Sequence, residues 1–382
     1  MGRARPTTGT KRPLGELYLL FSLLGCGGSG SGGGGPKSLF TPLTTGNPSG
    51  EDDDPAVALD AQGDLHVIWF SDRDGTKDLY YVRSTSIDLA TETIDWTPEV
   101  QITQLGPASF PPPTQGDNFP SLFIDAAGTL NVAWHRWNLA NESHVLFLRS
   151  DGTAQGWANT TEVNVTSGPN FDQFPNVVRF APDDLRVYFA STTRKSLGVY
   201  DLFVAKSTDD GASFGAPTEV ASFNDPMQQS GFASVVKLSS SAYLATLDRW
   251  AIGRSFLDPT TDVFYAESSD GETWTVDAVS VDPTDDQVDF TPALFFDHAS
   301  AAHVGWASTA FGDPAADVVE LLASQRALYP ASADVVNPAP GIVDHSPKIV
   351  ALTIGGKAVF VMIWVRIANG HNQVGYRILS SL

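Results

Sequence analysis

The sequence predicts an all-β protein, a six-bladed β-propeller whose blades are four-stranded antiparallel sheets. Three observations lead to this fold. A short motif recurs six times at intervals of 55 to 65 residues, an apolar and mostly aromatic position follows it, and a strand-like segment then ends in serine. Self-similarity at a nearly fixed period is the signature of repeat architectures, and short strands separated by turns favour a propeller among them.

Each repeat opens with Asp-x-x-Pro and continues as a β-hairpin. Five copies read "DDDP", "DNFP", "DQFP", "DFTP" and "DHSP", and the fourth in chain order is the degenerate "SGFA" at 230–233. Fourteen residues beyond the first five copies stand Trp69, Trp134, Phe189, Leu247 and Trp306. The sixth copy has Trp364, 17 residues after its proline. Between motif and aromatic, alternating apolar runs joined by turn residues, as in "AVALDAQGDLHVIW", predict two strands.

Two further strands complete each blade, and the N-terminus supplies one of them. Segments such as "DLYYVRS" and "QVGYRILS" form the third strand, and shorter runs such as "PEVQIT" form a fourth in five copies. The sixth copy lacks a fourth strand of its own. Because "SLFTPLTTG" (38–46) precedes the first motif as each fourth strand precedes the next motif, we expect it to close the ring and leave fewer exposed edges.

Composition fits a large folded domain and restricts its partners. The 382 residues are 42% hydrophobic and 10% aromatic, which is enough for a large core. The formal net charge is −21 and the sequence pI is near 4.5. This charge argues against nucleic acid, or an anionic bilayer surface, as a partner of the folded part. Cations and neutral glycans are compatible with it.

The first 37 residues indicate secretion and lipid anchoring. Basic residues precede the apolar run "LYLLFSLLG", which is too short to span a bilayer, so residues 1–25 are predicted to be a signal peptide. The sequence "LLGC" resembles the lipobox of bacterial lipoproteins, although Leu24 stands where that motif usually has a smaller residue. The resemblance implies lipidation of the only cysteine, Cys26, and anchoring in the bacterial envelope, at the outer membrane, through the lipid alone. The alternative is a buried or unpaired thiol. Residues 26–37 are then a Gly/Ser-rich tether, and residues 38–382 form the propeller.

The stretch "STDDGASF" (207–214) raises the question of whether an acidic turn is a catalytic site or a structural fastener. It begins at the end of the third strand of copy three, and "SSDGETW" (268–274) occupies the same place in copy four. Asp209 is suited to accept backbone N–H groups, Gly211 to adopt positive φ and Phe214 to pack under the blade. These roles favour a fastener, because short acidic turns readily bond their own backbone.

Both stretches resemble the Asp-box, or bacterial neuraminidase repeat, of the sialidase superfamily. The resemblance covers residues 38–382 as an architecture. It implies that each Asp-box is the turn between third and fourth strands, on the face away from the ligand. The residues that match the motif are Ser207, Asp209, Gly211, Phe214, Ser268, Asp270, Gly271 and Trp274. Copies one and two keep traces of it, Ser84 with Trp96 and "SDGTAQGW" ending at Trp157.

Two sets of polar residues are predicted at the mouth of the channel on the opposite face. The acids of the motifs are Asp52, Asp117, Asp172, Asp289 and Asp344, with Ser230 in copy four. Two residues after each strand-ending aromatic stand Ser71, Arg136, Ser191, Arg249, Ser308 and Arg366. We expect the principal ligand site to combine the acid ring with Arg136, Trp137, Arg249, Trp250 and Arg366. Arginine recognises carboxylates, and exposed tryptophan stacks on sugars or cations. The alternative is that the acids cap turns and the arginines balance their charge.

Three functions are open on the sequence. The first is a binding platform for a glycan or protein ligand. The second is glycoside hydrolysis of the sialidase type, which needs three arginines on a carboxylate and a tyrosine nucleophile with a glutamate partner. No catalytic residue is assigned, because the Phe-Arg-Ile-Pro signature of that family is absent and no Tyr–Glu pair falls on the channel face. The third is a structural scaffold without a small ligand.

No cofactor is predicted, and calcium is the only metal considered. The four adjacent acids of "GEDDDP" (50–55) are candidate ligands, but they lack the spacing of a known calcium loop, and a solvated turn is the alternative. The seven histidines show no HExxH or paired spacing, so a zinc site is not expected.

Overall fold

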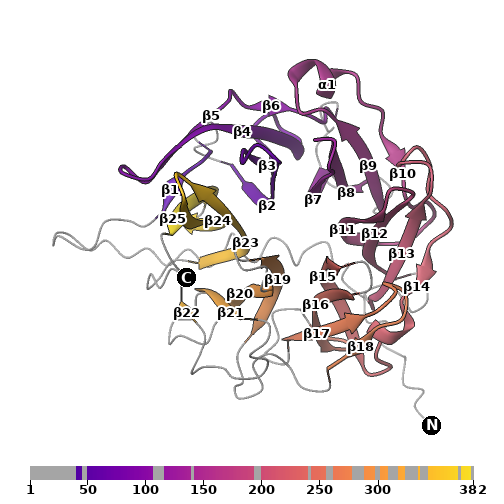
Figure 1. Cartoon of the computed structure of the whole chain (residues 1–382). Coiled ribbons are helices and arrows are strands. Elements are labelled where there is room, and N and C mark those ends of the chain that lie inside the picture. The colour runs from indigo at the N-terminus through magenta and orange to yellow at the C-terminus, as the bar shows by residue number, and fades with distance from the viewer. Residues whose placement is uncertain are drawn as a thin grey trace, which may run out of the picture.

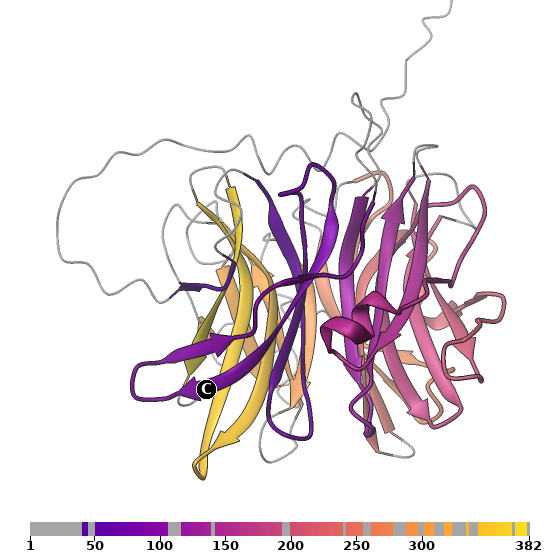
Figure 2. The ribbon, with the colours of Figure 1, turned by 90° about the horizontal axis from the view of Figure 1, so that it is seen from above.

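The strands form antiparallel sheets arranged as the blades of a ring, and they run roughly along its axis (Figures 1 and 2). The computed structural model describes residues 40–44, 50–105, 116–138, 142–192, 199–239, 242–254, 261–277, 288–296, 302–308, 317–322, 334–335, 343–368 and 371–379. An all-β propeller is therefore confirmed. The predicted signal peptide, Cys26 and nearly all of the tether region lie outside the described residues. Within the described ranges, no helix is long and apolar enough to cross a membrane.

Within the described ranges the strands fall into six sheets, numbered here as blades 1 to 6 in chain order. Blade 1 contains β2 (Asp52–Leu59), β3 (Leu65–Ser71), β4 (Asp78–Asp88) and β5 (Thr93–Trp96), with β6 (Val100–Gln101) also on β4. Blade 2 contains β7 (Gly116–Ile124), β8 (Leu130–Trp137), β9 (Ser143–Ser150) and β10 (Val163–Asn164), with helix α1 (Ala154–Ala158) between the last two. Blade 3 contains β11 (Asp172–Ala181), β12 (Asp184–Ser191), β13 (Asp201–Ser207) and β14 (Thr218–Glu219).

The remaining blades repeat this order. Blade 4 contains β15 (Gln228–Ser239), β16 (Ala242–Ala251), β17 (Asp262–Ser268) and β18 (Thr275–Val276). Blade 5 contains β19 (Asp289–Phe296), β20 (Ala302–Ser308), β21 (Asp317–Leu322) and β22 (Asp334–Val335). Blade 6 contains β23 (Val343–Ile354), β24 (Lys357–Ala368) and β25 (His371–Leu379), and its outer strand is β1 (Thr41–Pro42).

The apolar positions predicted to end the second strands lie in the core. Trp69, Trp134, Trp306 and Trp364 are completely buried and are among the largest such side chains. Phe189 and Leu247 occupy the same position in blades 3 and 4 and are also buried. Their constant distance from the motif follows from a hairpin of nearly constant length. Blade 6 has a longer hairpin, in which Ile354 pairs with Lys357, and this accounts for its longer spacing.

The N-terminal strand β1 pairs with the last strand of the chain. Thr41 lies opposite Tyr376 and Pro42 opposite Gly375 in antiparallel register. The ring of Phe40 packs edge-on against Trp364 with centroids 5.1 Å apart. Gly375 leaves the space for it, because a Cβ there would lie 2.3 Å from the Phe40 ring. The last blade is thus completed by the beginning of the chain.

The β4–β5 hairpin strengthens the same junction. Both ribbon views show it extending from blade 1 across the yellow blade 6 (Figures 1 and 2). The backbone N–H of Ile94 donates to the hydroxyl of Tyr376 at 2.9 Å, and the rings of Trp96 and Tyr376 meet edge to face at 5.8 Å. Tyr376, predicted to lie in a third strand, therefore holds both β1 and this hairpin.

The Asp-x-x-Pro motif forms a β-bulge at the start of each innermost strand. The register shifts at this place in all six sheets. In five copies the residue before proline has a positive φ of 49° to 55°, and these residues are Asp54, Phe119, Phe174, Thr291 and Ser346. Such a conformation is unfavourable for a residue with a side chain and costs roughly 1–3 kcal/mol. Its repetition shows that the fold requires it.

Hydrogen bonds between neighbouring blades follow directly after the bulge. The side chains of Ser121, Asn176 and Ser234 each stand one residue after the proline position. They accept the backbone N–H of Val177, Val235 and Leu294 of the next blade at 3.0–3.1 Å. The bulge therefore places a side-chain acceptor against the backbone of the neighbouring innermost strand, which links blades 2 to 5 around the channel.

The first Asp-box is a fastener between blades 3 and 2. Asp209 accepts the backbone N–H of Ser213 at 2.9 Å, and Ser207 accepts that of Gly211 at 2.8 Å. Gly211 has φ +85°, and a Cβ there would lie 2.2 Å from the ring of Phe147 in blade 2. Phe214 packs edge-on against Phe147 at 5.2 Å. The turn therefore has the backbone and packing roles expected from the sequence.

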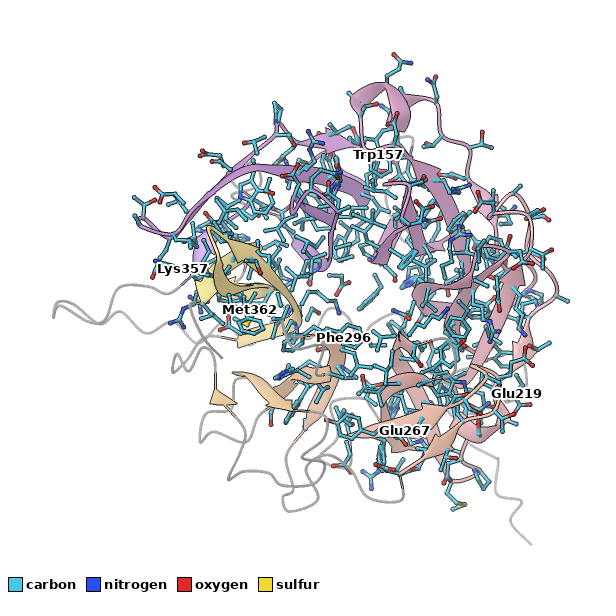
Figure 3. All side chains as sticks on the ribbon, in the orientation of Figure 1. Trp157, Glu219, Glu267, Phe296, Lys357 and Met362 are labelled. Carbon is cyan, nitrogen blue, oxygen red and sulfur yellow. The ribbon has the colours of Figure 1, made fainter. Side chains whose placement is uncertain are left out.

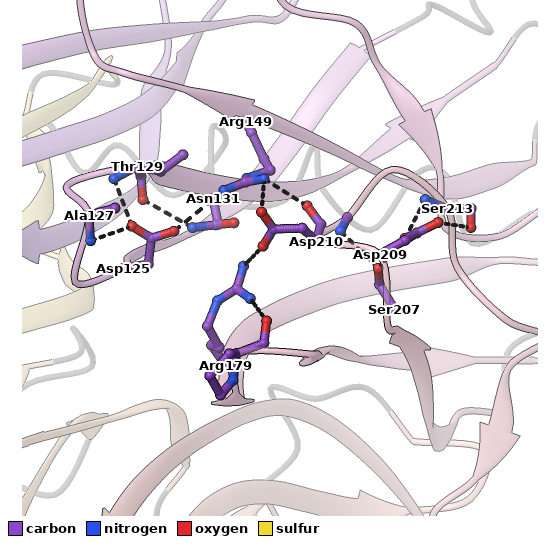
Figure 4. Close-up of polar contacts among 12 residues, drawn as sticks. Asp125, Ala127, Thr129, Asn131, Arg149, Arg179, Ser207, Asp209, Asp210 and Ser213 are labelled. Atoms are coloured by element: carbon purple, nitrogen blue, oxygen red, sulfur yellow. Dashed lines mark hydrogen bonds and ion pairs between the residues drawn. The ribbon is translucent and has the colours of Figure 1, made fainter.

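An ion-pair network joins this Asp-box to blade 2 (Figure 4). The carboxylate of Asp210, the second acid of the turn, lies between Arg149 of β9 and Arg179 of β11. Its distance to Arg179 is 2.6 Å, and Arg149 also lies 3.5 Å from Asp125. The acidic turn is thus neutralised by arginines from two blades.

The second Asp-box repeats the arrangement between blades 4 and 3. Gly271 has φ +67°, and its carbonyl accepts from Tyr188 at 2.8 Å and from Arg186 at 2.5 Å. The aromatic residue at the end of each Asp-box, or of its trace, contacts the preceding blade. The pairs are Trp96 with Tyr376, Trp157 with Tyr81, Phe214 with Phe147, and Trp274 with Tyr188.

Substituting two glycines of similar φ separates the cost of conformation from the cost of packing. Gly271→Ala places a Cβ 1.9 Å from the ring of Phe180, whereas Gly253, with φ +80°, has nothing within 4 Å of its Cβ position. We expect Gly253→Ala to lower the free energy of unfolding by about 1–2 kcal/mol. Gly271→Ala should lower it by roughly 1–3 kcal/mol more through overpacking. Denaturant titration of both variants measures this, and equal losses would exclude close docking of the Asp-box on blade 3.

Candidate functional site

The candidate site is a cavity of about 380 Å³ on the axis of the ring, lined by the innermost strands of all six blades. Side chains fill the spaces between blades, and Phe296 of β19, which lines the cavity, lies near the centre of the ring (Figure 3). All five residues of positive φ also line it: Asp54, Phe119, Phe174, Thr291 and Ser346. In five of the six motifs, the strained residue thus lines the channel.

Blades 2 and 3 contribute aromatic rings. Phe119 and Phe174 meet edge to face at 4.8 Å, and His135 stacks on Phe119 at 5.4 Å. Burial lowers the pKa of His135 to about 3, so this imidazole is neutral and packs behind the two rings. The hydroxyl of Tyr200 donates to the side-chain carbonyl of Gln173 at 3.0 Å, which places polar groups beside Phe174.

Blades 1 and 6 contribute charged groups. Asp53 accepts the backbone N–H of Asp54 at 2.7 Å and the side-chain amide of Asn372 at 2.5 Å. Ser346 donates to Asp54 at 3.3 Å. Burial raises the pKa of Asp54 well above its usual range, the neighbouring carboxyl of Asp53 raises it further, and Lys348 opposes the shift. Asp54 is therefore disposed to hold a proton where an exposed aspartate would be ionised.

The acidic segment 50–55 is neither a solvated turn nor a metal site among the described residues. Asp52, Asp53 and Asp54 are all buried within β2, so the expectation of a solvated turn is wrong. In the part of the chain that the structure describes, no group of three His, Cys, Asp or Glu side chains is arranged to hold a metal ion.

The acids of the predicted ring lie within the sheets of the blades. Each acid pairs with a residue of the neighbouring second strand, the one that stands two positions after the buried aromatic residue. Asp117 receives two hydrogen bonds from Arg136, at 2.6 and 2.9 Å, and Arg136 also binds Glu162. Asp344 likewise receives two from Arg366, at 2.9 and 3.0 Å. Both arginines thus neutralise buried acids, as the alternative reading of the sequence expects.

The other members of the ring have different partners. Asp52 pairs with Arg73 at 3.2 Å, and Asp172 accepts from Ser191 at 2.5 Å. The side chain of Asp289 lies outside the described residues. Sequence analysis did not identify Arg73, although it stands only two residues after Ser71.

The arginines and tryptophans of the predicted ligand site do not line the cavity. Arg249 donates to the carbonyl of Phe223 at 2.7 Å. Trp250 is only 4% exposed and covers Gly231, where a Cβ would lie 2.9 Å from the indole. The expectation of an exposed Trp250 is wrong. Trp137 is partly exposed and packs against Phe171 at 5.3 Å. None of Arg136, Trp137, Arg249, Trp250 and Arg366 is among the residues that line the cavity.

Four residues that do line it were not predicted to bind the ligand: Phe119, Phe174, Lys348 and Asp54, of which Asp54 was considered only as a calcium ligand. Three of them occupy the variable position just before the proline, and Lys348 follows the sixth proline directly. The sequence contained a signal for these residues, because the motif recurs in every repeat while the residue beside its proline changes in chemical character. The prediction rested on the recurring acid of the motif, whereas the residue before the proline is the one that lines the cavity.

Comparison with known proteins shows a fold and no family. No family model matches the chain, and no curated protein matches it. A protein of unknown function from Dyadobacter fermentans is 15% identical with a TM-score of 0.61, covering 87% of this chain and 95% of that one. An α-L-arabinanase of Penicillium chrysogenum, solved with arabinobiose, is 14% identical with a TM-score of 0.62, covering 90% and 96%.

A sialidase of Streptococcus pneumoniae has a TM-score of 0.54 at 10% identity, covering 86% of this chain and 68% of that one. The chain therefore has a β-propeller fold similar to those of arabinanases and sialidases. Identities this low show the fold alone.

A second buried acid lies outside the cavity, at the junction of blades 4 and 5. Asp248 is completely buried, and its Oδ2 accepts the backbone N–H of Thr291 at 3.4 Å. Among the described residues, its Oδ1 has no hydrogen-bond partner. Burial raises the pKa of Asp248 to about 7. The carboxyl group thus binds the backbone of the strained residue Thr291, and it loses its own contact with water in doing so.

Asp248→Asn should change how stability depends on pH. A folded-state pKa near 7, against about 3.8 in the unfolded chain, means that ionising Asp248 destabilises the fold progressively as pH rises from about 4 to 7. The variant removes this loss. The difference in unfolding free energy, variant minus wild type, should therefore be roughly 2–4 kcal/mol larger at pH 8 than at pH 4. Asp183→Asn, which removes an exposed carboxylate, is the control. A pH-independent difference in unfolding free energy would contradict the shift.

Proposed function

We propose that the protein is a lipid-anchored component of the bacterial envelope whose propeller binds a glycan in its axial cavity. The observation that carries this proposal is the division of the cavity into two sides. Phe119 and Phe174 offer apolar ring surface on one side, and Asp54, Ser346 and Lys348 offer hydrogen-bonding groups on the other. Ligand sites of small molecules typically have this composition and volumes of about 300–1,000 Å³.

The similar structures support an oligosaccharide as the ligand. The Penicillium arabinanase was solved with arabinobiose, and its fold resembles this one over most of both chains. We further propose that the six sheets are the full set of blades and that β1 closes the ring. The axial cavity is then enclosed on every side and open only along the axis.

Arg136 and Trp137 have a secondary place in this proposal. Both side chains are partly exposed at the end of β8, where a ligand longer than the cavity would emerge. The buried Arg249, Trp250 and Arg366, with the acid ring, instead keep the ends of the second strands rigid. A protein ligand on this face is the alternative partner.

Hydrolysis of the bound glycan is a second candidate function. The specific observation in its favour is Asp54, a cavity-lining carboxyl whose pKa is raised by burial. A general acid must hold its proton near neutral pH, and burial is a common means of achieving this. An arginine cluster of the sialidase type has less support, because Arg136 and Arg366 are bound by Asp117 and Asp344.

A glycan array followed by titration tests the proposal. We expect wild type to bind at least one class of oligosaccharide and Phe119→Ala to weaken that binding by roughly 10-fold to 100-fold, because buried aromatic contacts dominate recognition. Leu238→Ala, at an exposed apolar side chain outside the cavity lining, should bind as wild type. Thermal unfolding shows whether each variant is folded.

A turnover assay on the same ligands separates the alternatives. If the protein is a hydrolase, Asp54→Asn should abolish turnover while binding persists. Binding without turnover identifies a recognition platform. A wild-type protein that binds no member of the array contradicts a glycan site and leaves the scaffold function.

Anchoring through Cys26 is tested in a host that processes lipoproteins. We expect wild type to incorporate a radiolabelled or alkyne-tagged fatty acid and to fractionate with membranes. Cys26→Ala should lose the label and enter the soluble fraction, because the thiol is the predicted acceptor of the lipid. A wild-type protein without label in that host rules out lipid anchoring.

A further inference from the structure

The six residues that directly follow the proline positions of the motifs form a ring around the channel. Lys348 is the only charged residue among them. The other members are Ala56, Ser121, Asn176, Ser234 and Ala293. Three of these accept a backbone N–H from the next blade, and two are small. A lysine ammonium can only donate, so Lys348 cannot make the hydrogen bond that this position makes in blades 2 to 4. Packing between blades therefore does not account for a lysine at this position.

The ammonium of Lys348 lines the cavity and makes no hydrogen bond or close ion pair within the described part of the chain, although Asp54 interacts with it electrostatically. Burial lowers the pKa of Lys348 to about 8, and Asp54 opposes this shift. The group is therefore mostly protonated at pH 7. Burial raises the pKa of Asp54, which weakens this carboxyl as a counter-charge, and no hydrogen bond joins the two groups. A partly buried cation without a hydrogen-bond acceptor is costly, which marks a place for a ligand group.

The other cations of the cavity lining are already bound. Arg179 pairs with Asp210 at 2.6 Å, and Lys237 donates to the carbonyl of Phe180. Lys348 is thus the cation of the described cavity lining that is available to a ligand. A positive charge inside a protein of net charge −21 attracts anions only over a short range, which confines their binding to the cavity.

We propose that the glycan bound in the axial cavity carries an anionic group, a carboxylate or a sulfate ester, and that Lys348 binds it. This inference rests on the proposed glycan site and specifies its ligand class. Neutral sugar rings contact the aromatic side of the cavity, and the acidic substituent meets Lys348 on the side of blades 6 and 1. Arg136 and Arg366 do not bind this group, because Asp117 and Asp344 occupy them, and Arg249 is bound to the carbonyl of Phe223.

The test uses matched ligands that differ only in charge, with the full chain. Oligogalacturonate is compared with its methyl ester, a sulfated oligosaccharide with its desulfated form, and neutral arabino-oligosaccharides serve as reference. We expect wild type to bind one acidic member about 10-fold or more tightly than its neutral counterpart, and this preference to weaken with added salt. The preferred pair shows whether the group is a carboxylate or a sulfate.

Three variants assign the preference to Lys348. Lys348→Met keeps the length of the side chain and should abolish the preference, whereas Lys348→Arg should retain most of it. Lys357→Met removes the same charge from an exposed position of blade 6 and should leave the preference unchanged. Because Lys348 is unpaired, Lys348→Met should unfold at the same temperature as wild type or higher, which verifies that it is folded.

The outcomes distinguish this inference from the proposed function. If wild type binds neutral and acidic members equally, or if Lys348→Met keeps the preference, the anionic ligand is excluded while a glycan site stands. If wild type binds neither kind, both are overturned.

Discussion

The structure depends on a bulge with positive φ that recurs at the start of the innermost strands. In five blades a residue with a side chain takes a conformation that glycine would adopt at less cost, and a proline follows it. The bulge separates the faces of the motif: the acid at its first position lies within the blade, and the residue before proline faces the channel. Without it, strict alternation would not place both residues in these positions.

Contacts between blades offset the free-energy cost of this strain. Side chains such as Ser121 and Asn176 bind the backbone of the next innermost strand, and each Asp-box docks its glycine and its aromatic ring on the preceding blade. One set of contacts lies near the axis and the other at the opposite end of the blade. A blade is therefore held to its neighbours at both ends, and the channel face is free to vary in chemistry without loss of the fold.

The sequence predicted the architecture well because the fold repeats. The buried tryptophans, the hairpins, the Asp-box turns and the pairing of Thr41 and Pro42 with the last blade all left periodic signals. The site left a weaker one. Trp250 was expected to be exposed, yet it fills the space over Gly231, which the degenerate fourth motif provides. Lys348 could be recognised only once the register showed that its equivalents bond the next blade. Periodicity reveals what blades share, whereas a binding site depends on where they differ.

The pairing of Thr41 with Tyr376 also constrains how the protein folds. This contact joins nearly opposite ends of the chain, so it forms only after the last strand has been synthesised, and contacts of such long range slow folding. Until then β1 and the β4–β5 hairpin have no partner, and the nascent chain exposes strand edges that favour association with other chains. If the chain is exported as proposed, it folds outside the cytoplasm, and a chaperone there would have to cover the open seam until β1 and β25 have both arrived.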